Sequence, residues 1–199
     1  MDKVVREMRI IAGECKGRHI KPVPGMSTRP TTDKVRESIY NMIGPFFDGG
    51  QALDLYGGSG ALGIEALSRG MSKCIFVDRD SKAIETIKWN LEQTKFTGSA
   101  EVFRNDSKRA LKALNKREMT FSLVLLDPPY HKEQILYDLE KLCTFELLED
   151  KATIVVEHKK EVTLPEAVAE LQMTRQETYS GKTTISIYTY EQPAVEKED

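Results

Sequence analysis

The stretch Asp127-Pro128-Pro129-Tyr130 follows an apolar run, residues 123–126, that is typical of a buried strand. Asp127 precedes a proline and is confined to extended conformations, and two prolines without N–H groups stiffen the loop and leave the Pro128 carbonyl free to accept. A carboxylate and a carbonyl could hold both N–H bonds of an amino group on a nucleobase and aim its nitrogen at a methyl group. Tyr130 could stack on that base. These four residues are the predicted catalytic set, although an Asp-Pro turn after a strand is weak evidence alone.

A glycine-rich loop lies where the first predicted strand, 52–56, meets a helix. Gly58-x-Gly60-x-x-Gly63 matches the dinucleotide fingerprint, and Asp78 stands where that fingerprint places a ribose-binding acid. Asp54 favours a different cofactor, because a carboxylate at the end of the first strand would repel a pyrophosphate. It would attract the ammonium and sulfonium groups of S-adenosylmethionine. The loop therefore predicts a methyl-donor site, and an NAD-binding oxidoreductase is the alternative from another class.

Further cofactor contacts are predicted at the ends of the next two strands. Asp78 would accept hydrogen bonds from both ribose hydroxyls. Asp106 could accept from the adenine amino group while the Ser107 amide donates to a ring nitrogen, and a helix-cap role for Asp106 is nearly as good an interpretation. Asp80 is expected to cap the next helix. The full predicted cofactor set is Asp54, Tyr56, Gly58, Ser59, Gly60, Asp78, Arg79, Asp106 and Ser107.

The elements that must position these residues alternate along the chain after residue 49. Strands are predicted over 52–56, 73–78, 101–105, 121–126 and 153–157, with helical patterns between them. Two further strands, 171–179 and 183–190, flank a turn and would add antiparallel strands to the sheet edge. The alternation predicts an α/β fold built on a parallel sheet that is covered on both faces. In such sheets ligands bind outside the carboxyl ends of the strands, so we expect Asp127 to face the cofactor.

A basic segment occupies the start of the chain. Nine lysines and arginines stand against three acids between Lys3 and Arg36, although the net charge of the whole chain is −2. A β-hairpin with a basic face is predicted over 8–23, and a helix is predicted to start at Thr31 or Thr32 and to end at Gly44. A basic segment beside an otherwise acidic domain favours a polyanionic partner, with a merely solvated face as the alternative.

Length and composition limit the remaining possibilities. The 199 residues amount to about one domain, expected to be a monomer, and no apolar run approaches the roughly 20 residues of a membrane helix. Residues 1–7 lack the apolar core of a signal peptide, so we expect a cytoplasmic protein. We divide the chain into a basic N-terminal extension, 1–48, expected to meet a polyanion, a domain with the predicted methyl-donor site, 49–191, and a disordered polar tail, 192–199.

Cysteines and histidines, which often build disulfides, metal sites or catalytic triads, are scattered along the chain. The spacing of Cys15, Cys74 and Cys143 predicts neither disulfides nor a zinc site, and the three histidines form no pattern for a triad or a metal. Trp89 lies in a predicted helix and is assigned to packing rather than to base binding.

Taken together, the motifs resemble the RsmD-type methyltransferases, which methylate the exocyclic N2 of a guanine in small-subunit (16S) ribosomal RNA with S-adenosylmethionine. The resemblance rests on R-I-I-A-G-E-C-K-G-R (9–18), R-P-T-T-D-K-V-R-E (29–37), D-L-Y-G-G-S-G-A-L-G-I-E-A-L-S-R-G (54–70) and D-P-P-Y (127–130). It departs from the family pattern at Cys15, where tryptophan is usual, and at Tyr56-Gly57, where Phe-Ala is common.

The resemblance implies a class I, Rossmann-like fold with a mixed seven-stranded sheet and an N-terminal β-hairpin extension. It implies that residues 127–130 hold the base and that the partner is small-subunit ribosomal RNA or its assembling particle. The predicted RNA contacts are Arg9, Lys16, Arg18, Arg29, Thr31 and Arg36. An adenine-N6 methyltransferase, which shares D-P-P-Y, and a protein-glutamine methyltransferase, which tends to carry Asn at the Asp127 position, are the nearest rivals.

Overall fold

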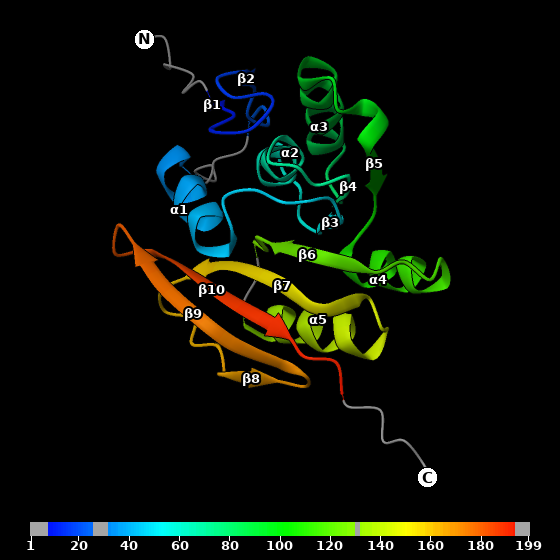
Figure 1. The fold of residues 1–199 in the computed structure, drawn as a ribbon, viewed down its shortest axis with the longest axis vertical. Helices are drawn as coiled ribbons and strands as arrows, with labels where there is room; N and C mark the ends of the chain where they lie inside the picture. The colour runs from blue at the N-terminus through cyan, green and yellow to red at the C-terminus, as the bar shows by residue number, and fades with distance from the viewer. Residues whose placement is uncertain (1–7, 26–31, 130–131, 194–199) are drawn as a thin grey trace. The chain divides into compact units, whose positions relative to one another are not determined.

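The computed structural model describes residues 8–25, 32–129 and 132–193 (Figure 1). The chain divides into two units, Met1–Ser107 and Lys108–Asp199. The predicted boundary after residue 48 falls inside the first unit and stays a prediction. The two units are taken in turn.

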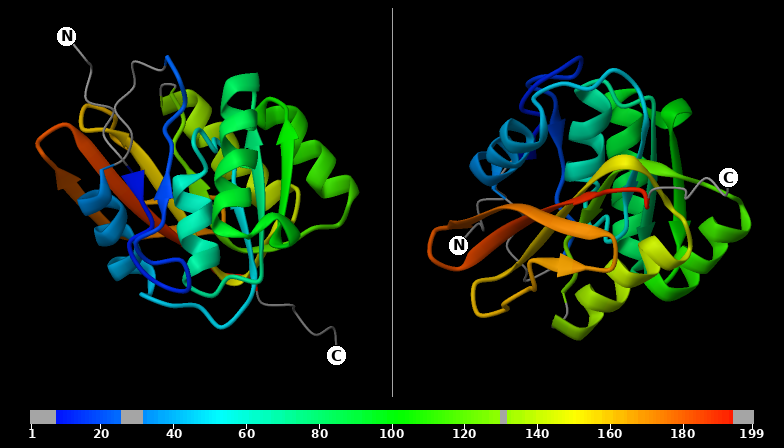
Figure 2. Two further views of the ribbon diagram at one scale, coloured as in Figure 1. Left: turned by 90° about the horizontal axis from the view of Figure 1, so that it is seen from above. Right: turned by 60° about the horizontal axis from the view of Figure 1, so that its bottom comes forward.

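The first unit is built on three parallel strands in the order β5-β4-β3. They are β3 (Gln51–Asp54), β4 (Lys73–Asp78) and β5 (Ala100–Arg104). The helix α2 (Ala61–Ser68) contacts β3 and β4, and α3 (Ser81–Thr94) contacts β4 and β5 (Figure 2). The middle residues of β3 and β4 are buried and apolar, as expected for parallel strands covered by helices. The predicted alternation of strands and helices is confirmed here.

The helix starts in this unit follow local capping chemistry. Asp80 caps α3, as predicted, with its carboxylate accepting from Lys82 N at 2.7 Å. Thr32 caps α1 (Asp33–Ile43) by accepting from Val35 N at 3.3 Å, and Gly44 ends the helix. The alternative cap, Thr31, lies outside the described residues. A single 3₁₀ turn, η1 (Thr97–Ser99), leads into β5.

The N-terminal segment, residues 8–25, forms the predicted hairpin in a reduced form. Its strands, β1 (Met8–Arg9) and β2 (His19–Ile20), are antiparallel and have two residues each. The residues between them instead bond to α2, for example through Glu14 N to Ser68 O at 2.8 Å. The hairpin is short because its backbone groups are satisfied by the helix that it packs against.

The second unit carries the strand order β6-β7-β10-β9-β8. These are β6 (Phe121–Leu126), β7 (Leu148–Lys159), β8 (Ala167–Val168), β9 (Leu171–Tyr179) and β10 (Thr183–Tyr190). β6 and β7 are parallel, whereas the remaining pairs are antiparallel. The predicted bounds of β6, β9 and β10 are confirmed, β7 is longer than predicted, and β8 is a short strand beyond the expected seven.

Two helices complete the second half of the chain. α4 (Ser107–Lys116) begins at the last residue of the first unit, and α5 (Lys132–Thr144) lies against β7 and β8 (Figure 2). No helix within the described ranges is long and apolar enough to cross a membrane. All three cysteines are buried and form no disulfide.

Candidate cofactor site and catalytic loop

The carboxylate of Asp78 ties the glycine loop to the end of β4. Its Oδ2 accepts from Gly58 N at 2.9 Å, and its Oδ1 accepts from Asp80 N at 2.8 Å. Gly57 N donates to Val77 O at 2.9 Å, so the loop is bound to β4 at two adjacent points. A carboxylate oxygen has two acceptor directions, and both oxygens can therefore take a further hydroxyl donor while keeping these bonds.

The backbone of the loop requires glycine where the fingerprint has it. Gly58 and Gly60 have φ values of 54° and 78°, in the left-handed region that other residues rarely adopt. At Gly63 an added Cβ would lie 2.3 Å from Phe76 Cε1. Gly63 therefore allows α2 to lie close against β4, which is the role of the third glycine in nucleotide-binding loops of this kind.

Asp54 is the last residue of β3 and is only 2% exposed. Its Oδ2 accepts from Gly63 N at 3.1 Å, at the start of α2. Burial raises the pKa of Asp54 to about 7, an effect that the Gly63 hydrogen bond reduces and the nearby Asp78 charge increases. A cationic ligand group beside this carboxyl group would favour its ionised form. This is the property expected of an acid that holds an ammonium group.

Asn90 is a residue of the site that the sequence analysis missed. It is fully buried on α3, and its Nδ2 donates to Ser59 O at 2.8 Å and to Lys21 O at 3.0 Å. Its Oδ1 accepts from Lys21 N at 2.9 Å. One amide therefore joins the glycine loop to the N-terminal segment. The available signal was an asparagine on the apolar face of a helix, since a buried amide requires partners.

The other predicted cofactor residues occupy the same edge of the first unit. Tyr56 and Ser59 are half-buried in the loop, Arg79 is exposed after β4, and Asp106 and Ser107 stand at the start of α4. Asn105 N donates to Asp78 O at 2.9 Å, which holds the end of β5 beside the end of β4. Asp54 and Asp78 thus end β3 and β4, and Asp106 follows β5. Their individual roles as cofactor contacts stay predictions.

The predicted catalytic residues, 127–130, follow β6 in the second unit. Residues 123–126 of β6 are buried, and the chain emerges at Asp127, which is exposed, followed by buried Pro128 and exposed Pro129. Tyr130 lies outside the described residues. The apolar strand therefore delivers a carboxylate to the surface at its carboxyl end, and its catalytic role stays a prediction.

The predicted RNA contacts divide into exposed and buried residues. Arg9, Lys16 and Arg18 are exposed, with Arg9 ion-paired to Asp33 at 3.4 Å. Arg29 and Thr31 lie outside the described residues. Arg36 requires a correction, because its side chain is fully buried and is not available to RNA in this structure.

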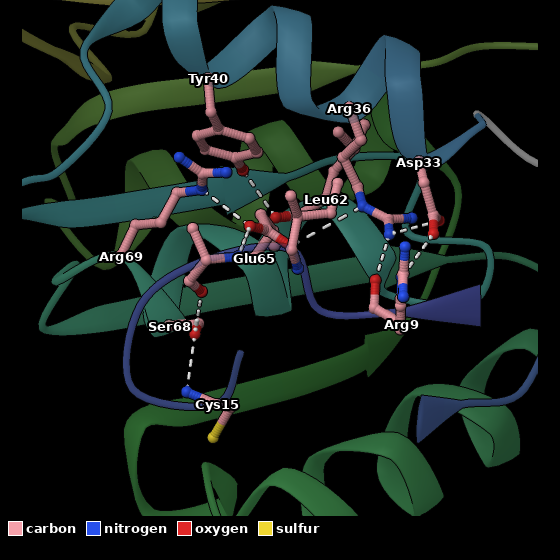
Figure 3. Close-up of polar contacts among 12 residues, drawn as sticks. Arg9, Cys15, Asp33, Arg36, Tyr40, Leu62, Glu65, Ser68 and Arg69 are labelled. Carbon is pink, nitrogen blue, oxygen red and sulfur yellow. Dashed lines mark hydrogen bonds and ion pairs between the residues drawn. The ribbon is translucent and has the colours of Figure 1, made fainter. Parts of the chain in front are cut away.

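The reason for the burial of Arg36 is a charge partner on another helix (Figure 3). Arg36 Nε lies 3.8 Å from Glu65 Oε2, and its Nη2 bonds to Asp33 Oδ1 at 3.0 Å and to the carbonyl of Arg9. Glu65, also fully buried, accepts in addition from Arg69 Nε at 2.7 Å. A guanidinium enclosed by carboxylates and a carbonyl holds α1 and the N-terminal segment against α2.

The described residues do not form a cluster of metal ligands. Within the described parts of the chain, no group of three or more His, Cys, Asp or Glu side chains is placed to hold a metal ion. The geometry instead offers acids at strand ends beside a glycine loop, an arrangement suited to a nucleoside with a cationic side group.

Comparison with known proteins identifies sequence relatives over nearly the whole chain. The family described as "Conserved hypothetical protein 95" matches residues 8–189. "Putative rRNA methyltransferase YlbH" of Bacillus subtilis is 57% identical over 181 residues, which cover 91% of this chain and 98% of that protein. "Ribosomal RNA small subunit methyltransferase D" of Escherichia coli is 33% identical over 186 residues, which cover 93% of this chain and 91% of the relative.

Solved structures show the same fold. "Putative methyltransferase yhhF from Escherichia coli" has a TM-score of 0.80 at 32% identity, covering 93% of this chain and 98% of that one. A putative methyltransferase complexed with SAH has a TM-score of 0.62 at 13% identity, covering 78% and 48% of the two chains, and shares the fold alone. The predicted α/β, Rossmann-like methyltransferase fold is confirmed.

Proposed function

Because the chain belongs to the family described as "Conserved hypothetical protein 95", we propose that it methylates the exocyclic N2 of a guanine in small-subunit ribosomal RNA with S-adenosylmethionine. The observation that carries the proposal is the Asp78 carboxylate, held by Gly58 N beside a buried Asp54 whose pKa is raised to about 7. The names of two relatives, an rRNA methyltransferase and a small-subunit rRNA methyltransferase, support ribosomal RNA as the substrate.

The first unit supplies the groups that would hold the cofactor. Both oxygens of Asp78 are oriented by backbone amides and would accept from the ribose hydroxyls. Asp54 would accept from the ammonium group, which favours its ionised form. Asp106 and the Ser107 amide would read the adenine edge. When bound, S-adenosylmethionine supplies an electrophilic methyl group on a positively charged sulfur.

The second unit supplies the groups that would orient the base. The Asp127 carboxylate and the Pro128 carbonyl would accept from the two N–H bonds of the guanine amino group. This favours a pyramidal nitrogen whose lone pair points at the methyl group. Orientation of this kind can supply about 7–11 kcal/mol when the geometry is tight. Asp127 need not be a strong base, since a methylated ammonium releases its proton readily. Tyr130 would stack on the base.

The substitution Asp127→Ala tests the catalytic assignment. We expect methyl transfer to unmodified small-subunit rRNA transcript to fall by at least about 10²-fold, the cost of misplacing a reacting atom by about 1 Å. Affinity for S-adenosylhomocysteine should stay within a few fold, because Asp54 and Asp78 are untouched. Transfer is followed with labelled S-adenosylmethionine, and the product nucleoside is identified by mass spectrometry.

A matched control is Asp150→Ala, which removes an exposed acid from β7 of the same unit and should leave turnover unchanged. Unchanged turnover in Asp127→Ala would reduce Asp127 to a turn residue. N6-methyladenine as the product would establish the adenine-N6 rival. Calorimetric binding of NAD in preference to S-adenosylhomocysteine would end the methyltransferase proposal.

A further inference from the structure

Trp89 is the single tryptophan of the chain and is 38% exposed on α3. Its neighbours Ile87, Asn90 and Leu91 are buried, so α3 directs its apolar face inward and the indole outward. The packing role predicted from the sequence therefore describes only part of this side chain. A single exposed aromatic residue is ordinary on a protein surface, and its surroundings decide whether it has a use.

Cations from the N-terminal segment lie on this stretch of α3. Lys21 Nζ is 4.3 Å from the centroid of the Trp89 ring. One turn further along, Arg18 Nη1 donates to Gln93 O at 2.7 Å. The exposed residues of α3 that flank Trp89 are Lys88, Glu85 and Glu92, so the helix alone offers no excess of positive charge. The segment that packs against it makes this surface attractive to phosphate.

Asn90 fixes the position of this pair. Its side-chain amide bonds both to the backbone N and to the backbone O of Lys21, at 2.9 and 3.0 Å, and the same amide donates to Ser59 O at 2.8 Å. Lys21 is therefore anchored at its backbone while its ammonium group lies over the ring. The anchor also joins this surface to the glycine loop. A ligand on Lys21 and Trp89 would consequently be held at a fixed position relative to that loop.

We propose that Lys21 and Trp89 form a contact surface for an unpaired nucleotide of the ribosomal RNA substrate, an inference that rests on the proposed function. The base stacks on the indole face, and the Lys21 ammonium moves from the ring to a flanking phosphate. The cation–π contact of the free protein is thus exchanged for a base stack and a charge pair. The partner is single-stranded, because bases inside a duplex do not expose their faces.

The single tryptophan makes the test direct, since all indole emission comes from Trp89. Unmodified small-subunit rRNA transcript and a 12-nucleotide oligouridine are added to the full chain, and emission is followed beside filter retention of the RNA. We expect saturable quenching that parallels binding with both RNAs, and little change with a 12-base-pair RNA duplex at matched occupancy. Trp89→Ala should weaken transcript binding about tenfold, and Trp89→Phe should weaken it less than threefold.

The matched control is Phe46→Ala, which removes another exposed aromatic residue, 64% exposed, from the same unit and should not change RNA binding. Lys21→Gln should lower the salt dependence of binding by about one phosphate contact. Affinity for S-adenosylhomocysteine, measured by calorimetry, should be unchanged in the Trp89 and Lys21 variants. A loss there would show that the pair only supports the fold and would overturn the inference.

The two proposals fail in different ways. Transcript that binds the chain with no change in Trp89 emission would overturn the contact surface and leave the methyltransferase proposal standing. Quenching by the duplex equal to that by oligouridine would overturn the stacked, unpaired nucleotide. Absence of binding and of methyl transfer with both the transcript and assembling small-subunit particles would refute the proposed function itself. Filter retention shows this outcome independently of the emission measurement.

Discussion

Two buried acids in the first unit have opposite surroundings: Glu65 belongs to α2, and Asp54 ends β3. Glu65 accepts from Arg69 Nε at 2.7 Å and from the amides of Ile11 and Ala12 at 2.9 and 3.0 Å, and Arg36 lies 3.8 Å away. Asp54 accepts from the Gly63 amide at 3.1 Å, the single hydrogen-bond donor to its side chain among the described residues, and burial raises its pKa to about 7.

The difference separates an acid whose charge is balanced by groups of the protein from one whose charge is not, which is the contrast we expect between an acid that holds the fold and an acid that binds a ligand. A buried carboxylate with opposite charges and amide donors around it has its desolvation offset inside the protein. A buried carboxylate whose pKa is displaced has a charge that the protein does not fully balance, and such groups cluster at functional sites. Glu65 belongs to α2 and accepts from the N-terminal segment, while Asp54 accepts from Gly63 N of the same helix, so α2 connects that segment to the candidate cofactor site.

The largest expected effect comes from removing the balanced acid. Glu65→Leu leaves the guanidinium groups of Arg36 and Arg69 buried without their shared counter-charge, and it leaves the amides of two residues in the N-terminal segment without an acceptor. We expect the free energy of unfolding to fall by about 3–5 kcal/mol. Urea denaturation at pH 7, followed by far-ultraviolet circular dichroism, measures it.

Glu85→Leu is the matched control, since it replaces an exposed acid of α3 and should change stability by less than about 0.5 kcal/mol. A loss below about 1 kcal/mol in Glu65→Leu would mean that water or local rearrangement replaces the Glu65 contacts. Glu65 would then not be an acid that stabilises the fold, and its contrast with Asp54 would not hold.

The second expected effect is a pH-dependent change in stability that comes from Asp54, the acid whose charge the protein does not fully balance. Because the pKa of Asp54 is higher in the folded than in the unfolded chain, the folded state binds the proton more tightly. Its contribution to stability is therefore complete below about pH 4 and is lost as the pH rises to about 7 and above. Asp54→Asn removes this dependence. The variant should match the wild type near pH 4 and exceed its unfolding free energy by about 3–4 kcal/mol at pH 8.

Urea denaturation of both proteins at steps from pH 4 to pH 8 measures the difference, and only the difference between them isolates Asp54 from other titrating groups. The same variant should bind S-adenosylhomocysteine at least about tenfold more weakly, since an amide does not supply the charge that an ammonium group pairs with. Parallel stability curves for the two proteins would show that Asp54 is not displaced from its ordinary pKa.

The sequence predicted those parts of the molecule that local pattern controls. Strands ending in Asp78 and in Asp127 were identified because apolar runs and proline restrict the backbone within a few residues. Asp80 was recognised as a cap for the same reason. The bounds of β7 were predicted poorly, because the polar residues 149–151 interrupt its apolar pattern. Leu148, which precedes them, pairs with Phe121 of β6, a residue that is distant in sequence.

The wrong assignment of Arg36 and the omission of Asn90 have the same cause, because both residues contact segments that are distant in sequence. Arg36 was assigned to RNA contact through the family resemblance and its place in the basic segment, and its partner Glu65 is 29 residues away. Asn90 has contacts with Ser59 and Lys21 that no spacing in the sequence indicates. In both cases a signal existed in the polar residue on a buried helix face, but identifying the partner requires the fold.

The smallest expected effect tests whether docking of the N-terminal segment and the cofactor site are separable. Ser68 Oγ, at the far end of α2 from the glycine loop, donates to Ala12 O at 2.6 Å and accepts from Cys15 N at 3.0 Å. Ser68→Ala removes both bonds and leaves a buried amide without its acceptor. The unfolding free energy should fall by about 1–2 kcal/mol in urea denaturation. Affinity for S-adenosylhomocysteine should not change, because the contacts of Asp54, Asp78 and Asn90 stay in place. Weaker cofactor binding in this variant would show that loss of contacts between the N-terminal segment and α2 also disturbs the glycine loop. The contacts of Glu65 and those of Asp54 would then not be separable.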